Sequence, residues 1–300
     1  MAGPVYGTSH LVAPPLPRVT NSTSNPIGLL GLGLAGSALS ARLLAAGYTV
    51  YGYDPDPAAQ PPGVVRLNSE RAVAKACRCV LLSLPGPAEV AAVLANLDRA
   101  VEMLIDTTTG DPAAVEAAAT TLAARGIAYL DATLGGSSRQ IAAGEALVIC
   151  GADPAAFARA EPILLSISPQ LFHAGPPGTG TRMKLVFNLV LGLHRAVLAE
   201  GLEFARHSGL DPTRALAILE AGPAASRIMA AKGPKMINAD FTPEARLAQH
   251  AKDVGLMLSS TGAYLPLTTV HHDLLARAIA VGWGAEDNSA LIKVYQEQAP

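Results

Sequence analysis

The sequence predicts an α/β fold: a doubly wound parallel sheet followed by an all-α C-terminal domain that starts with a long interdomain helix. Short β-type runs alternate with helical stretches from Pro26 onward, which is typical of a parallel sheet covered by helices. After "GPPGTGT" at residues 175–181 the β-type runs stop. The 300 residues are enough for two such domains without disulfide or metal support.

The strands are expected in seven short runs. In chain order these are "IGLL", "YTVYGY", "CVLLSL", "EMLID", "IAYLD", "LVICG" and "LFHAG". Most of each run is apolar, as in strands that are buried between two layers of helices. A helix through Leu43 joins the first two runs, and Asp111 followed by Pro112 marks a later helix start. Residues 26–180 therefore form the domain that contains the sheet.

The second domain, residues 181–300, is expected to be entirely helical. Residues 182–207 form one long helix that ends before Gly209. Two further helix starts combine a capping residue with proline at the first helical position. They are Asp211 with Pro212, and Thr242 with Pro243, the latter followed by Glu244.

Composition and charge exclude several classes of protein. The formal net charge is -2 with no run of like charges, so neither nucleic acid nor an anionic membrane is an expected partner. The apolar run at residues 27–41 is too short to span a membrane. Three cysteines without CxxC spacing, and scattered histidines, support neither a disulfide framework nor a metal site. We expect a cytoplasmic protein in which residues 1–25, rich in Pro, Ser, Thr and Asn, are a flexible tail.

The stretch "GLGLAGSAL" at residues 31–39 follows the first strand and opens a helix. Gly31, Gly33 and Gly36 form GxGxxG inside a βαβ unit, which is the Rossmann-type arrangement for binding a dinucleotide pyrophosphate. A close-packed helix start is the alternative. Asp54 follows the second strand, where a carboxylate accepts hydrogen bonds from the adenosine ribose and repels a 2′-phosphate. The pattern therefore favours NAD, with NADP less expected.

The segment "RMKLVFN" offers a candidate for proton transfer. Lys184 and Asn188 are four residues apart and share one helix face among apolar neighbours. A lysine that faces an interdomain cleft has a lowered pKa and can exchange a proton with a substrate oxygen. A solvated helix lysine is the alternative.

Two further segments are open to two interpretations each. The glycines and hydroxyls of "DATLGGSS", residues 131–138, suit either an anion or a plain turn. Lys252 and Asp253 lie within a predicted helix, where a charged surface pair is the alternative to a site.

Taken together, these motifs resemble the β-hydroxyacid dehydrogenase family, and the resemblance covers almost everything after Pro26. "GLLGLGLAGSALSARLLAAGYTVYGYD" is similar to the family's cofactor fingerprint, "SLPGPAEV" to a strand ending in Leu-Pro, and "DTTTGDP" to a D-x-S/T-T segment. "DATLGGSSRQIAAGEALVICGAD" resembles the substrate loop, "GTGTRMKLVFN" the helix motif G-x-G-x-x-x-K-x-x-N, and "KDVGLML" a lysine-containing cofactor and substrate segment.

The resemblance implies a set of site residues. Lys184 is the implied catalytic acid and base. The implied substrate-binding residues are Gly135, Gly136, Ser137, Asn188 and Asp253. The implied cofactor-binding residues are Gly31, Leu32, Gly33, Leu34, Ala35, Gly36, Asp54, Leu84, Pro85, Thr109 and Lys252.

The substrate loop departs from the family pattern at three positions. Thr133 replaces proline, Gly135 replaces serine and Ser137 replaces glycine. Either Ser137 takes over the lost hydroxyl contact, or the bound anionic group differs from the usual carboxylate, as in a sulfonate or a larger hydroxy acid.

The implied activity is hydride transfer between NAD and a small anionic 3-hydroxy acid, or its semialdehyde or keto form, with Lys184 moving the hydroxyl proton. Two alternatives are an imine reductase-like enzyme that uses NADPH, a class that usually lacks this lysine, and a non-catalytic dinucleotide-binding scaffold. A homodimer or homotetramer is expected through the helical domain, which is rich in Ala and Leu.

Overall fold

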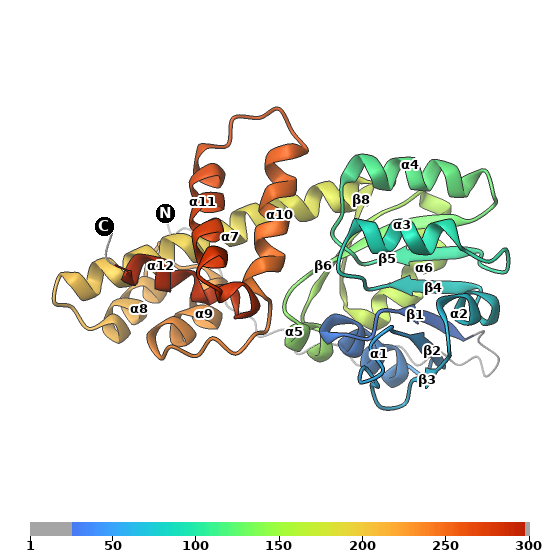
Figure 1. Cartoon of the computed structure of the whole chain (residues 1–300), viewed down its shortest axis with the longest axis horizontal. Coiled ribbons are helices and arrows are strands. Elements are labelled where there is room, and N and C mark those ends of the chain that lie inside the picture. The colour runs from blue at the N-terminus through green and yellow to red at the C-terminus, as the bar shows by residue number, and fades with distance from the viewer. Residues whose placement is uncertain (1–25, 298–300) are drawn as a thin grey trace, which may run out of the picture.

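The computed structural model describes residues 26–297, so the predicted tail at residues 1–25 lies outside the described residues. A sheet with its helices is followed along the chain by a group of helices (Figure 1). The long helix α7 (Thr179–His207) leaves the sheet and runs through the helical region (Figure 1). This is the α/β class with a long helix between two regions that the sequence predicts.

Eight strands form one sheet in the order β3-β2-β1-β4-β5-β6-β7-β8. Their bounds are β1 Ile27–Leu30, β2 Val50–Tyr53, β3 Val65–Arg66, β4 Cys79–Leu82, β5 Met103–Asp106, β6 Ala128–Gly135, β7 Leu147–Gly151 and β8 Gln170–Gly175. β1 to β6 run parallel, in the order of a Rossmann-type sheet. Their carboxyl ends therefore share one edge.

The last two strands run in the opposite direction. β7 pairs antiparallel with β6, and β8 is parallel to β7. The connection from β6 to β7 contains only the six-residue helix α5 (Ser138–Ala143), which is too little chain for a parallel crossover and returns the chain beside β6. The alternation of strands and helices in the sequence predicted a sheet that is parallel throughout, so the reversal at β7 was not predicted. The two-residue strand β3 was not predicted either.

Helices cover both faces of the sheet. One face packs against α1 (Leu34–Ala45), α5 and α6 (Pro154–Ile167), whose apolar side chains share one buried cluster with the sheet. The other face packs against α2 (Glu70–Ala76), α3 (Pro87–Ala95) and α4 (Pro112–Ala123), which form a second cluster. As predicted, Asp111 caps α4, because its carboxylate accepts the N–H of Ala113.

The helical region is built around α7. Its other elements are α8 Pro212–Ala221, α9 Arg227–Ile237, α10 Leu247–Ser259, α11 Pro266–Ala280, two short 3₁₀ helices at Trp283–Ala285 and Asn288–Leu291, and α12 Ile292–Gln296. α7 is long and apolar enough to cross a membrane by length and composition alone. However, α8 to α12 all pack against it, and its buried residues include Lys184, Arg195 and Glu203. These are the contacts of a central helix in a helical domain.

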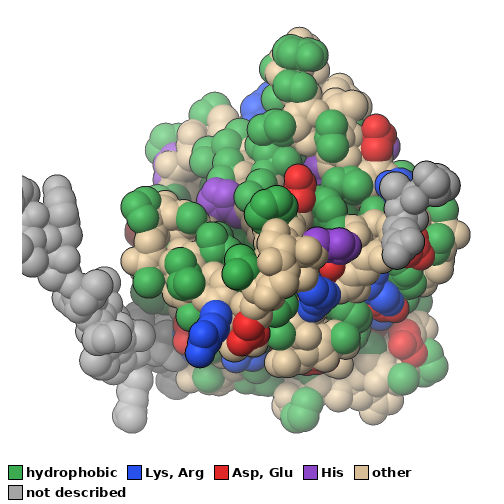
Figure 2. Space-filling model, turned by 90° about the vertical axis from the view of Figure 1, so that its left-hand side faces the viewer, with side chains coloured by type: hydrophobic (Ala, Val, Ile, Leu, Met, Phe, Trp, Pro, Cys, Tyr) green, Lys and Arg blue, Asp and Glu red, His purple; other side chains and the backbone are tan. Residues whose placement is uncertain are grey.

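The outer end of the helical region carries many apolar side chains. Figure 2 shows them spread over most of this face, with charged side chains scattered between them. Among the exposed apolar residues of the helical region are Val197 and Phe204 of α7, which are 66% and 73% exposed.

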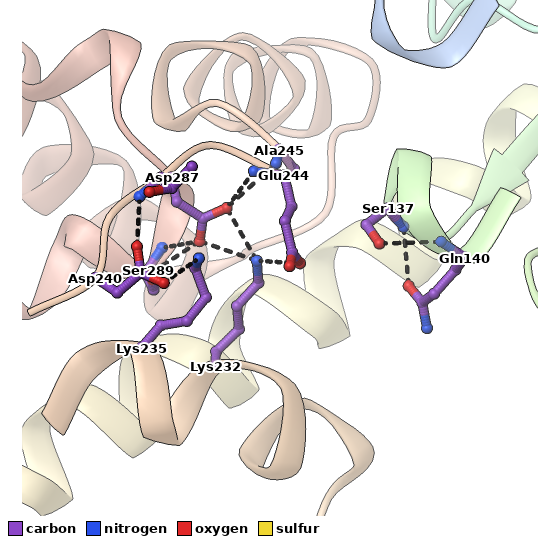
Figure 3. Close-up of polar contacts among 10 residues, drawn as sticks. Ser137, Gln140, Lys232, Lys235, Asp240, Glu244, Ala245, Asp287 and Ser289 are labelled. Atoms are coloured by element: carbon purple, nitrogen blue, oxygen red, sulfur yellow. Dashed lines mark hydrogen bonds and ion pairs between the residues drawn. The ribbon is translucent and has the colours of Figure 1, made fainter. Parts of the chain in front are cut away.

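The predicted helix start, with Thr242 as cap and Pro243 as first helical residue, is wrong, because α10 begins four residues later, at Leu247. The carboxylate of Asp287 accepts the backbone N–H groups of Glu244 and Ala245 at 2.9 and 3.2 Å (Figure 3). Arg246 pairs with Asp287 in a β-bridge, which requires extended backbone. A distant buried carboxylate thus overrides the local capping signal. The start at Asp211 is confirmed, since its carboxylate accepts the N–H of Thr213.

Candidate active site

The glycine loop after β1 leaves no room for side chains at two positions. At Gly31, which has a φ of +91°, an added Cβ would lie 2.1 Å from the carbonyl oxygen of Ser83. At Gly36 it would lie 2.0 Å from the carbonyl oxygen of Gly31. At Gly33, by contrast, it would meet nothing within 4 Å, so this part of the backbone faces open space. The loop is therefore tightly packed underneath and open above, as a phosphate cradle requires.

The start of α1 is also suited to an anion. Gly33 precedes the helix, and no side chain caps it within the described chain. The first-turn N–H groups therefore remain available to a negative group. Two features make these residues fit a dinucleotide pyrophosphate. The helix start is open and uncapped, and only glycine fits at the two positions beneath it.

Asp54 lies beside this loop, as predicted from its position after β2. Its Oδ2 accepts the N–H of Leu32 at 2.6 Å, and its Oδ1 accepts the N–H of Asp56 at 2.9 Å. Arg66 also contacts this loop, and the sequence did not predict this contact. Its guanidinium donates to the carbonyl oxygens of Asp54 and Ala59 at 2.5 and 2.7 Å. A guanidinium therefore supports the loop that carries the Asp54 carboxylate.

A cavity of about 380 Å³ opens between α2 and α3 near the ends of β1 and β2. Its lining includes the apolar side chains of Leu30 and Leu97 and the polar side chains of Ser69 and Arg71. Apolar walls with a polar rim suit a planar aromatic base.

Lys184 lies at the other end of this edge of the sheet, and it is buried, at 7% exposure. Its Nζ donates to the carbonyl oxygen of Leu134 in β6 at 2.5 Å. Burial lowers the pKa of Lys184 to about 8, although the nearby Asp253 carboxylate acts in the opposite direction. A lysine with this pKa exchanges protons readily near neutral pH. The alternative of a solvated helix lysine does not fit this structure.

The start of α7 explains why Lys184 is held here. The carboxylate of Asp131, in β6, accepts the N–H groups of Gly178 and Thr181 at 2.8 and 2.6 Å and so caps the helix. Gly180 allows the first turn to touch the sheet, because a Cβ there would lie 2.5 Å from the carbonyl oxygen of Asp131. The sequence predicted the helix from residue 182, and it begins three residues earlier for this reason. Asp131 therefore fixes the helix turn that carries the lysine.

α10 adds two further groups to the site. Asn188 donates from Nδ2 to Oδ2 of Asp253 at 2.9 Å, and both side chains are buried. Lys252 donates to the carbonyl oxygens of Pro85 and Thr109 at 3.2 and 3.1 Å. These two carbonyls lie in the loops after β4 and β5, so Lys252 joins the helical region to the edge of the sheet. Asp253 is thus a buried partner of Asn188 and not half of an exposed surface pair.

The loop after β6 places the remaining predicted substrate contacts. Gly135 ends β6, Gly136 has a φ of +154°, and Ser137 is the capping residue that precedes α5. The hydroxyl of Ser137 accepts the N–H of Gln140, while the Gln140 side chain accepts the N–H of Ser137 (Figure 3). This reciprocal cap fixes the position of the hydroxyl group. Its proton remains free to be donated.

Sequence reasoning missed three buried residues next to this site: Arg195, His250 and His271. The two histidines are 21 residues apart in sequence, but their Nε2 atoms are 3.0 Å apart. Arg195 is only 2% exposed. Asn188 and Arg195 follow Lys184 in α7 by four and eleven residues, so the three residues share one face of the helix. That spacing was the only signal available in the sequence.

Comparisons with known proteins agree with this architecture. Residues 26–175 match the NAD binding domain of 6-phosphogluconate dehydrogenase, and residues 178–295 match the NAD-binding domain of NADP-dependent 3-hydroxyisobutyrate dehydrogenase. The chain is 31% identical to 2-(hydroxymethyl)glutarate dehydrogenase of Eubacterium barkeri, over 90% of this chain and 95% of that relative. It is 28% identical to L-threonate dehydrogenase of Cupriavidus necator, over 91% and 96% of the two chains.

A solved structure of a related protein has the same fold. The 3-hydroxyisobutyrate dehydrogenase from Salmonella typhimurium superposes with a TM-score of 0.82 at 25% identity, and the match covers 90% of this chain and 100% of that chain. The two family matches, the curated relatives and the fold place the chain among the oxidoreductases that use a nicotinamide dinucleotide. The chain belongs to the β-hydroxyacid dehydrogenase family, in its 3-hydroxyisobutyrate dehydrogenase-like branch.

Proposed function

We propose that this protein is an NAD-preferring dehydrogenase of small 3-hydroxy acids, or a reductase of their semialdehyde or keto forms, with Lys184 as the general acid and base. The observation that supports this most directly is the position of Lys184. Its buried amine lies in the wall formed by β6, α7 and α10, beside the Asn188–Asp253 pair. A small anionic substrate is part of the same proposal, since the relatives named above are dehydrogenases of hydroxy acids. A cytoplasmic location is proposed as well, because Cys77, Cys79 and Cys150 are free thiols, as in a reducing compartment.

In this proposal the cofactor lies along the edge of the sheet. The amides of residues 31–36 would hold the pyrophosphate, Asp54 the adenosine ribose, and Leu84, Pro85, Thr109 and Lys252 the nicotinamide end. When bound, the nicotinamide supplies the hydride chemistry. Asp54 beside the N–H of Leu32 supports the preference for NAD, because its carboxylate repels a 2′-phosphate.

The chain's own residues account for substrate orientation and proton transfer. The amides of Gly135 and Gly136 and the hydroxyl of Ser137 would bind the acid group of the substrate. Asn188, oriented by its hydrogen bond to Asp253, would hold the reacting hydroxyl against Lys184. The neutral amine of Lys184 then takes the hydroxyl proton in oxidation, and its ammonium form returns a proton in reduction.

The proposal is tested by replacing the lysine. Lys184→Ala is expected to lower kcat about 10²- to 10⁴-fold, as for other positioned acids and bases. Affinity for NAD, measured by calorimetry, is expected to stay close to that of the wild type, because the glycine loop is far from the lysine along the edge of the sheet. Lys75→Ala, which removes an exposed lysine in α2, is the matched control and should leave kcat unchanged.

A second variant separates proton transfer from simple charge. Lys184→Arg keeps a positive charge that does not deprotonate near neutral pH, so it should remain slow. Recovery of most of the rate in Lys184→Arg would instead identify an electrostatic anchor. Full turnover in Lys184→Ala would support a different class of activity, such as NADPH-dependent imine reduction. NAD binding without turnover of any hydroxy acid by the wild type would favour a binding scaffold.

A further inference from the structure

Buried hydrogen bonds link the ends of β5 and β6. Asp106, the last residue of β5, is 3% exposed, and both oxygens of its carboxylate accept a hydrogen bond. Oδ2 accepts the hydroxyl of Tyr129, from β6, at 2.6 Å, and Oδ1 accepts the backbone N–H of Thr108 at 2.8 Å. Tyr129 is buried as well. The proposed function uses neither of these two side chains, although a buried carboxylate is unfavourable unless it is hydrogen-bonded.

Thr108 extends these hydrogen bonds to the loop after β4. Its Oγ1 accepts the backbone N–H of Leu84 at 3.2 Å, and its side chain is buried. Thr108 thus uses its N–H toward Asp106 and its hydroxyl toward Leu84. The series of hydrogen bonds runs from Tyr129 in β6, across the end of β5, to the loop after β4.

The two loops joined in this way contain the residues proposed to contact the nicotinamide end of the cofactor. These are Leu84 and Pro85 in the loop after β4, and Thr109 in the loop after β5. On the side of the helical region, Lys252 binds the carbonyl oxygens of Pro85 and Thr109. The loops are therefore held from two sides, by Lys252 from α10 and by Asp106 from within the sheet.

The charge of Asp106 depends on its surroundings in the sheet. Burial raises the pKa of Asp106 to about 6, and the Asp131 carboxylate at the paired position of β6 acts in the same direction, whereas the bonds from Tyr129 and Thr108 lower it. From α10, the ammonium group of Lys252 faces the same loop. At neutral pH the ionised carboxylate accepts both hydrogen bonds. When it is protonated, one oxygen becomes a donor, so its bond to Tyr129 or Thr108 is weakened.

We propose that Tyr129 and Asp106 are positioning residues for the nicotinamide end of the cofactor, because they fix Thr108 and, through it, the loop at Leu84. They act through Thr108 and need no contact with the cofactor themselves. This inference rests on the proposed function, which places the nicotinamide against the loops after β4 and β5. The adenosine end is expected to be independent of the pair, since Asp54 follows β2, and β1 and β4 lie between β2 and β5.

The inference is tested first by binding, without turnover. NADH and ADP-ribose, which share the adenosine diphosphate part and differ in the nicotinamide, are titrated into the full chain at neutral pH by calorimetry. Tyr129→Phe should raise the Kd for NADH about tenfold, as for the loss of a hydrogen bond to a charged group, and leave that for ADP-ribose unchanged. Tyr48→Phe, which alters another buried tyrosine just before β2, is the matched control and should change neither Kd. Unchanged NADH affinity in Tyr129→Phe, or an equal loss for both ligands, would overturn the inference.

A second variant tests whether the pair acts through Thr108. Thr108→Val keeps the shape of the side chain and removes the hydroxyl that accepts from Leu84. It should weaken the binding of NADH and leave that of ADP-ribose unchanged, as Tyr129→Phe does. The double variant Tyr129→Phe/Thr108→Val should lose little more NADH affinity than Thr108→Val alone, because residues in one hydrogen-bonded series are not additive. Two losses that simply add would contradict a connection through Thr108.

The pH dependence of binding distinguishes this role from a purely structural contact. In the wild type, the ratio of the Kd for NADH to that for ADP-ribose should rise as the pH is lowered through about 6, because Asp106 becomes protonated. The bond from Tyr129 lowers the pKa of Asp106, so in Tyr129→Phe the rise should begin at a higher pH. Asp106→Asn cannot ionise and should show no such rise. The same midpoint in the wild type and in Tyr129→Phe would contradict the assignment of the pair.

Hydrogen exchange separates this inference from the proposed function, because it needs no cofactor. In Tyr129→Phe, the backbone amides of Leu84 and Thr108 should exchange with solvent at least tenfold faster than in the wild type, while those of β1 keep their rates. Equal exchange rates at Leu84 and Thr108 would overturn the inference even if NADH binds as proposed. If the wild type binds NADH no more tightly than ADP-ribose, the proposed place of the nicotinamide is wrong, and the exchange rates decide separately whether the pair fixes the two loops.

Discussion

At the scale of single residues, burial determines what Lys184 can do. On a helix surface, a lysine near its usual pKa of 10.5 is charged at neutral pH and cannot accept a proton. Inside this site, burial lowers the pKa to about 8, and the Asp253 carboxylate limits the decrease. The carbonyl oxygen of Leu134 holds the amine in one position. The same side chain is therefore both oriented and able to change its charge in the physiological range.

This pKa predicts opposite pH dependences for the two directions of the reaction. Oxidation needs the neutral amine, so kcat should rise with pH and level off above about 8. Reduction needs the ammonium form, so kcat should be highest below about 8 and fall above it. Measuring kcat from pH 6 to 10 in both directions checks this, with cofactor and substrate saturating.

Asp253 provides the control for this assignment. Since its carboxylate raises the pKa of Lys184, Asp253→Asn should move both profiles toward lower pH. Profiles that do not move in this variant, or that move toward higher pH, would show that another group controls the rate.

Cofactor choice is a second property set at the residue scale. Asp54→Ser removes the carboxylate beside the glycine loop and leaves the Arg66 guanidinium close to it. The ratio of kcat/KM for NADP to that for NAD should therefore rise about tenfold or more, as expected for the loss of a charge-assisted hydrogen bond. Asp56→Ser, two residues away and exposed, is the control and should leave the ratio unchanged. A wild type that prefers NADP would contradict the role given to Asp54.

At the scale of elements, the sequence correctly predicted helix starts that are determined by neighbouring residues. Asp111 and Asp211, each before a proline, cap helices where the sequence places them, because the carboxylate reaches the N–H two residues on. The same signal at Thr242 failed, because the backbone there is held by Asp287, 45 residues further along the chain. The positions of the glycine loop at the start of α1, and of Lys184 and Asn188 on one face of α7, were predictable because each depends on a few neighbouring residues and the regular geometry of a helix.

Features that depend on packing between elements were not predictable in this way. The direction of β7 follows from the short connection through α5, whose length is not marked by any residue type. The contact between His250 and His271 depends on α10 and α11 packing against Gly192 at one level. Arg66 lies next to Asp54 only because β3 pairs with β2. In each case the residues belong to no recognisable sequence motif, and their contact is known only from the folded structure.

The segment before α10 gives a stability prediction at the element scale. Asp287 and Lys232 form a buried ion pair, and Asp287 also accepts two amides that hold this segment. Asp287→Ala removes the buried partner of Lys232 and leaves it only Glu244, 3.4 Å away, so the free energy of unfolding should fall by about 3 kcal/mol, the lower end for broken buried pairs. Urea titration measures this. Arg78→Ala, in the exposed pair with Glu102, is the control and should cause no measurable loss.

Low pH is expected to weaken the same ion pair between Asp287 and Lys232 and so lower the free energy of unfolding. Burial alone would raise the pKa of Asp287, but the bonds from Lys232 and from the N–H of Glu244 lower it to about 2. The stabilising contribution is therefore complete above the unfolded pKa near 3.8 and is lost as the pH falls toward 2. The loss of stability between pH 4 and 2 should be smaller in Asp287→Ala than in the wild type. Equal losses would exclude this carboxylate as the acid-sensitive group.

At the scale of the whole molecule, α7 has two faces with different roles. The face with Lys184, Asn188 and Arg195 lies inward against α10 and α11. On the opposite side, Val186, Val190, Val197 and Phe204 are 52%, 46%, 66% and 73% exposed. Their spacing of four, seven and seven residues places them in one narrow stripe along the helix. A single exposed apolar residue is ordinary, but a continuous apolar stripe of this length marks an interaction surface.

We expect this stripe to pack against a second copy of the chain, giving a homodimer or homotetramer through the helical region. A two-fold axis would place equivalent stripes against each other, so one charged substitution would act on both sides of the interface. The double variant Val197→Glu/Phe204→Glu should therefore shift the mass in light scattering toward that of the monomer at micromolar concentration, while circular dichroism keeps the helical signal. Val65→Glu, which is 47% exposed on β3 at the edge of the sheet, is the matched control and should leave the mass unchanged. A monomeric wild type, or a double variant that assembles as the wild type does, would show that the stripe is not the interface.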